Sequence, residues 1–89
     1  MGFYVYVIQS EVDQSYYKGF SEQPGTRLLQ HNNGDSSYTS AKIPWRLIYV
    51  EECSTKKDAL VRERTLKKYS HSQIQRLALS DKNIARQLG

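Results

Sequence analysis

Apolar residues gather in three short stretches of the chain, and each stretch predicts a β-strand. Residues 3–9 and 16–20 are rich in aromatic and β-branched side chains, and residues 45–52 have four consecutive apolar positions at their centre. A short polar connector, residues 10–15, separates the first two stretches. Such a connector favours pairing of the two strands as an antiparallel hairpin.

Helix start and stop signals predict one helix directly after the hairpin. Pro24 suits a first helical turn. A helix that begins there is expected to end near Asn32, because Asn33-Gly34 is a typical C-terminal signal. The residues that follow, 35–43, are mostly polar and predict a loop before the third strand.

Two patterns that resemble capping boxes predict helices after the third strand. Thr55 with Asp58 has the required spacing, and the helix that it begins is expected to reach about residue 69. Ser72 with Gln75 repeats the spacing and predicts the start of another helix.

The end of the chain predicts a last turn that begins at Ser80-Asp81 and carries Ile84, Ala85 and Leu88. The expected order is therefore β-β-α-β-α-α, an α/β (α+β) arrangement in which helices cover a three-stranded sheet. A chain of 89 residues has room for one hydrophobic core, so a single domain over residues 1–89 is expected.

Composition narrows the class of protein. Cys53 is the single cysteine, so it has no disulfide partner within the chain, and with two histidines it makes a poor zinc site. Residues 1–9 resemble a strand and not a signal peptide, and no apolar run approaches the roughly 20 residues of a membrane helix. A cytoplasmic protein without membrane association is expected.

The placement of the basic residues indicates more about possible binding partners than the net charge of +4 does. Six of the thirteen Lys and Arg residues lie within residues 56–68. A basic stripe on one helix is typical of a protein that binds a phosphate backbone, although solvated helix faces also carry such stripes. The candidate nucleic-acid contacts are Lys42, Arg46, Arg62, Arg64, Lys67 and Lys68.

The hairpin brings two of the seven tyrosines to one face of the sheet. We expect Gln9 to pair with Tyr16. In this register Tyr6 lies opposite Gly19 and diagonal to Tyr17, so both phenols project from the same face. Gly19 is expected to leave an open patch beneath Tyr6. Core packing alone also explains two tyrosines on one face, and the glycine favours a site.

Three further polar residues occupy positions that suit phosphate chemistry. Arg27 and His31 are four residues apart on one helix face, where the first can hold a phosphate and the second can move a proton. On a helical projection Glu63 falls between Leu60 and Leu66, in the middle of an apolar arc. A carboxylate there either pairs with a neighbouring cation or holds a divalent cation.

Taken in order, these motifs resemble those of the GIY-YIG nucleases. The landmarks are Tyr4-Val5-Tyr6, Tyr17-Lys18-Gly19, residues 27–32, residues 43–51 and Arg62-Glu63. The resemblance covers residues 3–80, and the family includes a nuclease domain of the bacterial repair excinuclease and small single-domain relatives of it. It implies a three-stranded antiparallel sheet flanked by helices, metal-dependent endonuclease activity on DNA rather than RNA, and a place in DNA repair.

The resemblance also implies a catalytic role for each candidate residue. Glu63 would ligate Mg²⁺ or Mn²⁺, which stabilises charge on the scissile phosphate. Tyr6 would act as the general base that activates water, and His31 would assist its proton transfer. Tyr17 would position the water or the phosphate, and Arg27 would neutralise the developing charge.

Departures from the family pattern leave other functions open. Tyr4 replaces a glycine and Lys18 replaces an aliphatic residue in the two signature triplets. Many members carry an asparagine beyond the acid, where this chain has Gln73 and Gln75. The alternatives are a nucleic-acid-binding protein of the same fold that does not cut, and an interaction domain without a nucleic-acid role. A monomer or weak dimer is expected, with a partner protein that supplies substrate specificity.

Overall fold

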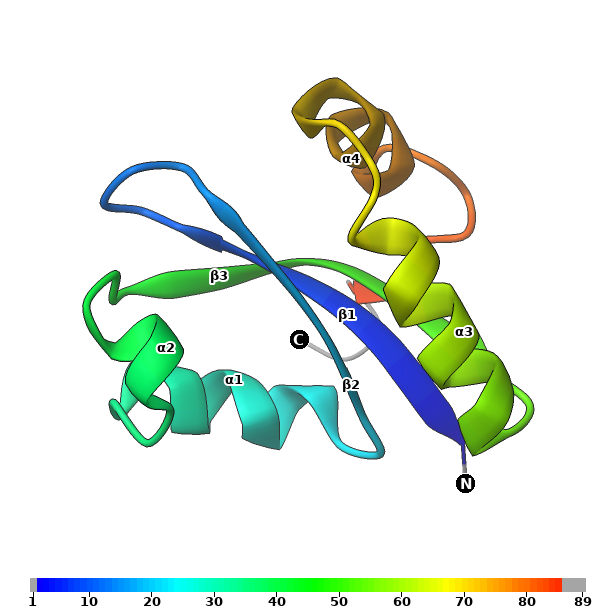
Figure 1. Ribbon diagram of the computed structural model, residues 1–89, viewed down its shortest axis with the longest axis horizontal. Helices are drawn as coiled ribbons and strands as arrows, with labels where there is room; N and C mark the ends of the chain where they lie inside the picture. The colour runs from blue at the N-terminus through cyan, green and yellow to red at the C-terminus, as the bar shows by residue number, and fades with distance from the viewer. Residues whose placement is uncertain (1, 86–89) are drawn as a thin grey trace.

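The predicted hairpin forms, and the third strand lies beside the first strand of the hairpin. In the computed structural model, which describes residues 2–85, β1 (Phe3–Ser10) pairs antiparallel with both β2 (Tyr16–Ser21) and β3 (Trp45–Cys53). The strand order is therefore β2-β1-β3, with β1 in the centre (Figure 1). The expectation of a three-stranded antiparallel sheet flanked by helices is confirmed.

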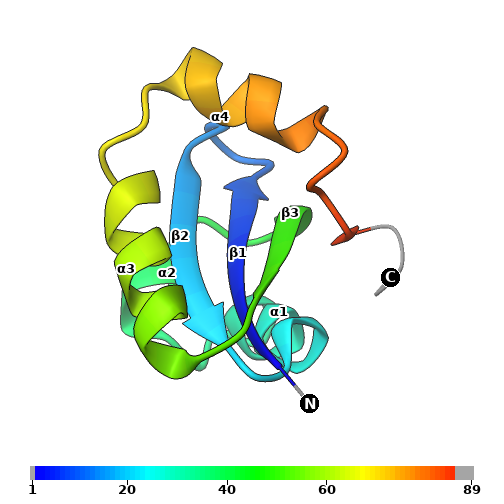
Figure 2. The ribbon, with the colours of Figure 1, turned by 90° about the vertical axis from the view of Figure 1, so that its right-hand side faces the viewer.

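Helices cover both faces of the sheet, so both faces of β1 are buried. The helices in the described part of the chain are α1 (Pro24–Asn32), α2 (Ser37–Ser40), α3 (Lys56–Leu66) and α4 (His71–Ala78). Val5 and Val7 pack against residues of α3 and α4, whereas Tyr6 and Ile8 lie on the opposite face with residues of α1 (Figure 1 and Figure 2). The predicted assignment of alternate β1 side chains to two faces is therefore confirmed.

The hairpin register is the one expected from the sequence. Tyr6 lies opposite Gly19, and Gln9 lies opposite Tyr16. A shift of one residue would have moved every side chain of β2 to the other face. The observed register keeps Tyr17 on the same face as Tyr6.

The last helix begins earlier than predicted. Its N-cap is Ser70, whose hydroxyl accepts a hydrogen bond from the backbone N–H of Gln73, while Gln73 Oε1 accepts one from the N–H of Ser70 at 2.7 Å. The prediction of a capping box at Ser72 and Gln75 was therefore wrong. Both pairs have the same spacing, so the pattern alone does not choose between them.

One more helix boundary and one predicted loop differ from the sequence prediction. Thr55 caps α3 as expected, because its hydroxyl accepts from the N–H of Asp58, but α3 ends at Leu66 and not at Tyr69. The chain then turns so that Tyr69 packs against the core. The predicted loop 35–43 contains the one-turn helix α2.

The turn expected at Ser80 holds the end of the described chain against the outer edge of β3. The side-chain oxygen of Asn83 accepts from Val50 N–H, and its amide donates to Ile48 O at 2.8 Å. The N–H of Ile84 also donates to Val50 O at 2.9 Å. Ile84 then packs on the Tyr6 face of the sheet. The predicted Leu88 lies outside the described residues.

None of the described helices, which lie between residues 24 and 78, is both long enough and apolar enough to cross a membrane.

Candidate active site

A buried chain of hydrogen bonds links β1, α1 and α2. The hydroxyl of Tyr6 lies 3.0 Å from Nε2 of His31, and Nδ1 of His31 lies 2.8 Å from the hydroxyl of Thr39. The Thr39 hydroxyl donates in turn to Ser36 O. Because the Thr39 hydroxyl gives its proton to Ser36 O, we assign Nδ1 of His31 as the donor to Thr39 and Nε2 as the acceptor from Tyr6. All three linked side chains are 0–1% exposed.

The environment keeps the Tyr6 proton on the phenol and the His31 ring neutral. Burial raises the pKa of Tyr6, and the Arg27 guanidinium opposes this shift, while Tyr17 and Glu63 raise the pKa further. Burial, followed by Arg27, lowers the pKa of His31. Both shifts favour the uncharged form of the side chain, as expected for groups removed from water.

Tyr17 packs against the same histidine from the neighbouring strand. Its ring centroid lies 5.0 Å from that of His31 and 6.5 Å from that of Tyr6. A Cβ atom on Gly19 would lie 2.6 Å from the Tyr6 hydroxyl. The prediction of an open patch beneath Tyr6 was therefore wrong, because the Tyr6 phenol itself fills the space that the missing side chain of Gly19 leaves.

Arg27 lies one helical turn before His31, as predicted. Its guanidinium is half-buried, and Nη1 donates a 2.7 Å hydrogen bond to Gln30 Oε1. It lines a hollow between the end of β2 and α1, together with Thr26 and Gln30. The remaining guanidinium N–H groups are the ones available to a bound phosphate.

Glu63 lies on the flank of α3 and not at the centre of its apolar stripe. The stripe consists of Ala59 and Leu66, both 0% exposed, whereas Leu60 is 38% exposed. The prediction that counted Leu60 as part of the apolar arc was wrong. With about 100° per residue, Glu63 falls some 50° to one side of the Ala59–Leu66 line and Arg62 a similar angle to the other.

The carboxylate of Glu63 has a weak protein partner. Its side chain is 20% exposed, and Oε2 lies 3.8 Å from Nζ of Lys67, which is 60% exposed. Mg²⁺ in proteins keeps several water ligands and needs only one or two carboxylates. The residues described contain no cluster of three His, Cys, Asp or Glu side chains that could hold a metal. Glu63 as a single carboxylate ligand, completed by water and phosphate oxygens, fits this chemistry.

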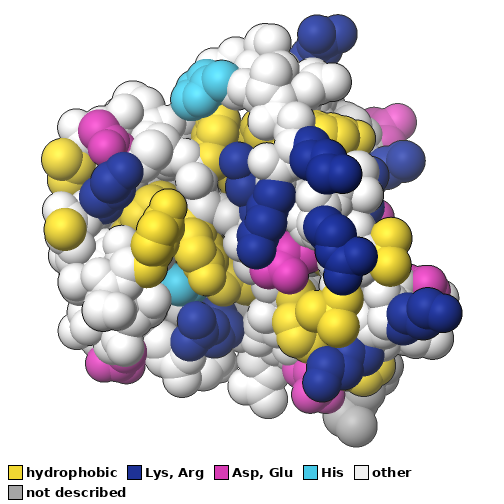
Figure 3. All heavy atoms as spheres, in the orientation of Figure 1, with side chains coloured by type: hydrophobic (Ala, Val, Ile, Leu, Met, Phe, Trp, Pro, Cys, Tyr) yellow, Lys and Arg dark blue, Asp and Glu magenta, His cyan; other side chains and the backbone are white. Residues whose placement is uncertain are grey.

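The predicted phosphate contacts fall into two groups. Arg64, Lys67 and Lys68 are exposed on or just after α3, and Arg46 is exposed on β3. The face in Figure 3 has basic and acidic side chains beside an exposed hydrophobic group between α2 and α3. Lys42 is different, because it forms an ion pair at 3.1 Å with Asp13 in the hairpin turn.

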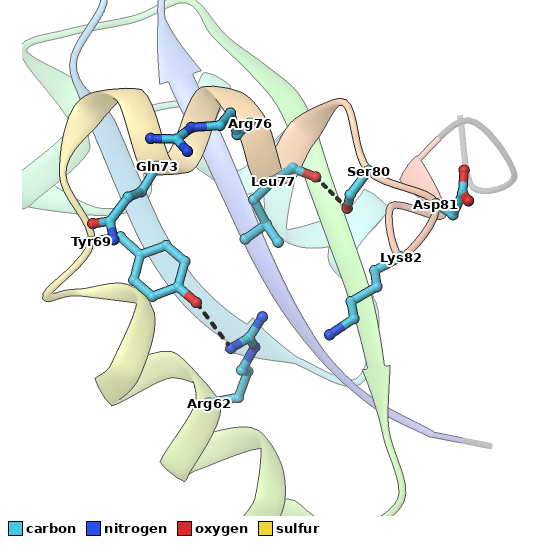
Figure 4. A pocket seen from close by; sticks show the side chains of 8 residues that line it. All are labelled: Arg62, Tyr69, Gln73, Arg76, Leu77, Ser80, Asp81 and Lys82. Carbon is cyan, nitrogen blue, oxygen red and sulfur yellow. Dashed lines mark hydrogen bonds between the residues drawn. The ribbon is translucent and has the colours of Figure 1, made fainter.

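Arg62 lies on the opposite face of the sheet from Tyr6. It forms an ion pair with Glu51 at 3.1 Å and lines a cavity of about 590 Å³ between α3 and α4 (Figure 4). Gln73 lines the same cavity, and its side chain completes the cap of α4. Gln75 is exposed on α4. The structure therefore brings neither glutamine into the cluster around Tyr6.

Thr39 is the member of this cluster that was not expected from the sequence. It lies in α2, a segment predicted as a loop, and the sequence pattern carries no signal for its contact with His31. Trp45 fixes the segment, because its indole N–H donates to Thr39 O at 2.9 Å. Asn32 in turn holds Trp45 through hydrogen bonds to the backbone N–H and carbonyl of Trp45.

Comparison with known proteins identifies the family to which the chain belongs. The model of the GIY-YIG catalytic domain matches residues 2–77 of the chain. The chain belongs to the GIY-YIG family. This membership supports a nuclease-like function and nucleic-acid binding.

Similar family members include small UPF0213 proteins. A UPF0213 protein of Staphylococcus epidermidis is 37% identical over 79% of this chain and 85% of its own length. A UPF0213 protein of Haloquadratum walsbyi is 34% identical over 84% of each chain. The solution NMR structure of a UPF0213 protein from Bacillus halodurans aligns with a TM-score of 0.57 and 26% identity, over 92% of this chain and 87% of the other.

Proposed function

We propose that the protein is a divalent-metal-dependent endonuclease that hydrolyses phosphodiester bonds in nucleic acid, with DNA as the expected substrate. The observation that carries this proposal is the buried hydrogen-bonded chain from Tyr6 through His31 to Thr39. A phenol that donates to a neutral imidazole can pass its proton on while it receives another. This is the property required of a tyrosine that activates water.

In the proposed reaction, a water molecule transfers a proton to the Tyr6 oxygen while the Tyr6 hydroxyl proton moves to Nε2 of His31. The resulting hydroxide attacks phosphorus, and the bond from phosphorus to the leaving oxygen breaks. The proton taken from water then passes from Tyr6 through solvent to the leaving oxygen, and the imidazolium returns its proton to the Tyr6 oxygen, which restores the starting state. Thr39 accepts from Nδ1 throughout, which maintains the tautomer and orientation of the ring.

The remaining residues bind and orient the phosphate in this proposal. Arg27 would bind a phosphate oxygen and neutralise the charge that develops on it. The Tyr17 phenol would position the attacking water. Glu63 would hold Mg²⁺ or Mn²⁺, which supplies charge neutralisation on the scissile phosphate and the leaving oxygen.

A cleavage assay with labelled branched, single-stranded and duplex DNA and RNA, in Mg²⁺ or Mn²⁺, tests the proposal. We expect Tyr6→Phe to lower the cleavage rate by about 10²-fold or more, the scale of general-base loss. The variant leaves Nε2 of His31 without its donor, at a cost of about 1 kcal/mol in folding free energy.

Tyr4→Phe is the matched control for this assay. Tyr4 lies on the same face of β1, and its hydroxyl makes no hydrogen bond within residues 2–85. We expect this variant to cut at the wild-type rate. A Tyr6→Phe variant that also cuts at that rate would contradict the role of Tyr6 as the base.

One observation favours a second function, a nucleic-acid-binding protein that does not cut. The family asparagine is absent, and Gln73 is engaged in capping α4 away from Tyr6. This alternative predicts oligonucleotide binding by the wild-type protein with no cleavage of any substrate in either metal.

A further inference from the structure

A second hollow adjoins the candidate active site at the edge of β2. It has a volume of about 520 Å³ and is lined by Tyr16, Tyr17, Lys18, Tyr38 and Lys67. Among the described residues, its lining therefore contains three aromatic rings and two ammonium groups and no carboxylate. Tyr17 also packs against His31, so one side chain is shared by the hollow and the cluster around Tyr6.

Tyr38 stands outside both hydrophobic clusters of the described residues. The other six tyrosines all belong to or pack against the two hydrophobic clusters, whereas Tyr38 is 74% exposed on α2. Its ring centroid lies 5.7 Å from that of Tyr17, at an interplanar angle of 46°. An exposed aromatic ring beside a half-buried one offers a stacking surface to a planar ligand.

The two lysines supply positive charge at the rim of the same hollow. Lys18 is half-buried, and its Nζ lies 5.9 Å from the Tyr16 ring centroid. Lys67 is 60% exposed, and its ion pair with Glu63 is long, at 3.8 Å. Both ammonium groups can therefore reach an anion outside the hollow at little cost in broken contacts.

We propose that this hollow binds an unpaired nucleobase of the strand being cut, stacked on Tyr38 and Tyr17, with Lys18 and Lys67 at the flanking phosphates. Aromatic rings interleaved with cations are the recurring surface for single-stranded nucleic acid. A base within a duplex has both ring faces covered by its neighbours, so only an unstacked base presents a face to Tyr38. The inference rests on the proposed function only in saying that the bound strand is the one that is cut. Binding of the base can be tested without cleavage.

Binding is measured in EDTA, with short oligonucleotides that carry one 2-aminopurine at successive positions. Stacking of the base on a tyrosine quenches its fluorescence, and anisotropy of a distant label reports affinity. We expect the wild type to quench the single-stranded oligonucleotide and not the fully paired duplex. Tyr38→Ala should abolish the quenching and weaken single-strand binding about 5- to 150-fold, the range for loss of one base–aromatic stack.

Two variants serve as matched controls. Tyr38→Phe keeps the ring and should bind and quench as the wild type does. Leu79→Ala removes an apolar side chain that is 87% exposed and does not line the hollow, and it should also bind normally. An abasic oligonucleotide should bind wild type and Tyr38→Ala equally, because it has no base to stack.

Several outcomes would overturn the inference. These are an absence of quenching in the wild type, unchanged quenching in Tyr38→Ala, and equal weakening of duplex and single-strand binding by that variant. Quenching that depends on Tyr38 in a protein that cuts no substrate would support this inference and contradict the proposed function. The two proposals therefore fail separately.

Discussion

At the scale of single residues, the position of Glu63 determines what its removal should do. Its side chain is 20% exposed, and its cationic partner Lys67 is largely in solvent. A long ion pair whose cation lies largely in solvent contributes at most about 1 kcal/mol to the free energy of unfolding. We therefore expect the fold to tolerate loss of this carboxylate, whose negative charge adds to the raised pKa of Tyr6.

We expect Glu63→Gln to abolish cleavage and to leave the melting temperature in metal-free buffer close to that of the wild type. Mg²⁺ should raise the melting temperature of the wild type and not of the variant, because a ligand stabilises only the state that binds it. Glu11→Gln, an isosteric change at an exposed turn residue, should keep both cleavage and the metal response. A destabilised Glu63→Gln variant that still responds to Mg²⁺ would identify Glu63 as a structural residue.

The residues around Tyr6 were predictable where a local period determines the geometry. The period of two placed Tyr6 and Tyr17 on one face, and the helical period placed Arg27 beside His31. The contact between His31 and Thr39 joins two helices across a turn, so the periodicity of a single helix does not predict it. The register expected for the hairpin was correct. The space beside Gly19 was expected to be open, but the Tyr6 ring fills it, and the position of this ring depends on the folded sheet.

At the scale of elements, the hairpin depends on close packing between its two strands. The ring of Tyr6 lies directly over Gly19, which is buried in β2. A side chain at this position would meet the phenol carbon and oxygen and not the end of a flexible chain. The Tyr6 ring would then have to move away from His31.

We expect Gly19→Ala to cost about 1–3 kcal/mol in the free energy of unfolding, the usual cost of overpacking. Cleavage should fall by more than the loss of folded protein explains, because the Tyr6 hydroxyl is displaced. Gly25→Ala is the control, since a Cβ there has no neighbour within 4 Å and alanine favours a helix. Urea unfolding and cleavage at matched folded fractions measure both effects, and wild-type activity in folded Gly19→Ala would disprove the link.

Other features at this scale differ in how far the sequence determines them. The strands and α1 follow from periodicity and from the Pro24 and Gly34 signals, which act locally. The start of α4 was ambiguous because two serine–glutamine pairs share one spacing. The strand order β2-β1-β3 results from burying both faces of β1, and this is a tertiary effect that no local pattern specifies.

At the scale of the whole molecule, the basic residues are not equivalent. Lys42 and Arg62 are paired with Asp13 and Glu51, so their charges already have partners within the fold. Lys68 is exposed just after α3 and makes no ion pair with any residue in the 2–85 range. The net charge of +4 therefore does not show which surfaces can attract phosphates and which cannot.

This difference predicts how salt should affect binding. Each phosphate contact releases counterions, so log affinity should fall linearly with log salt between about 50 and 300 mM, with a slope of roughly −0.9 per contact for duplex DNA and −0.7 for single strands. Lys68→Gln should make the slope shallower by about one contact, whereas Lys42→Gln, which removes a cation already paired with Asp13, should leave it nearly unchanged. Anisotropy titrations over this salt range measure both slopes in the absence of metal. Equal effects of the two substitutions would mean that binding depends only on the total charge of the protein. An affinity that does not change with salt would remove the electrostatic argument for nucleic-acid binding.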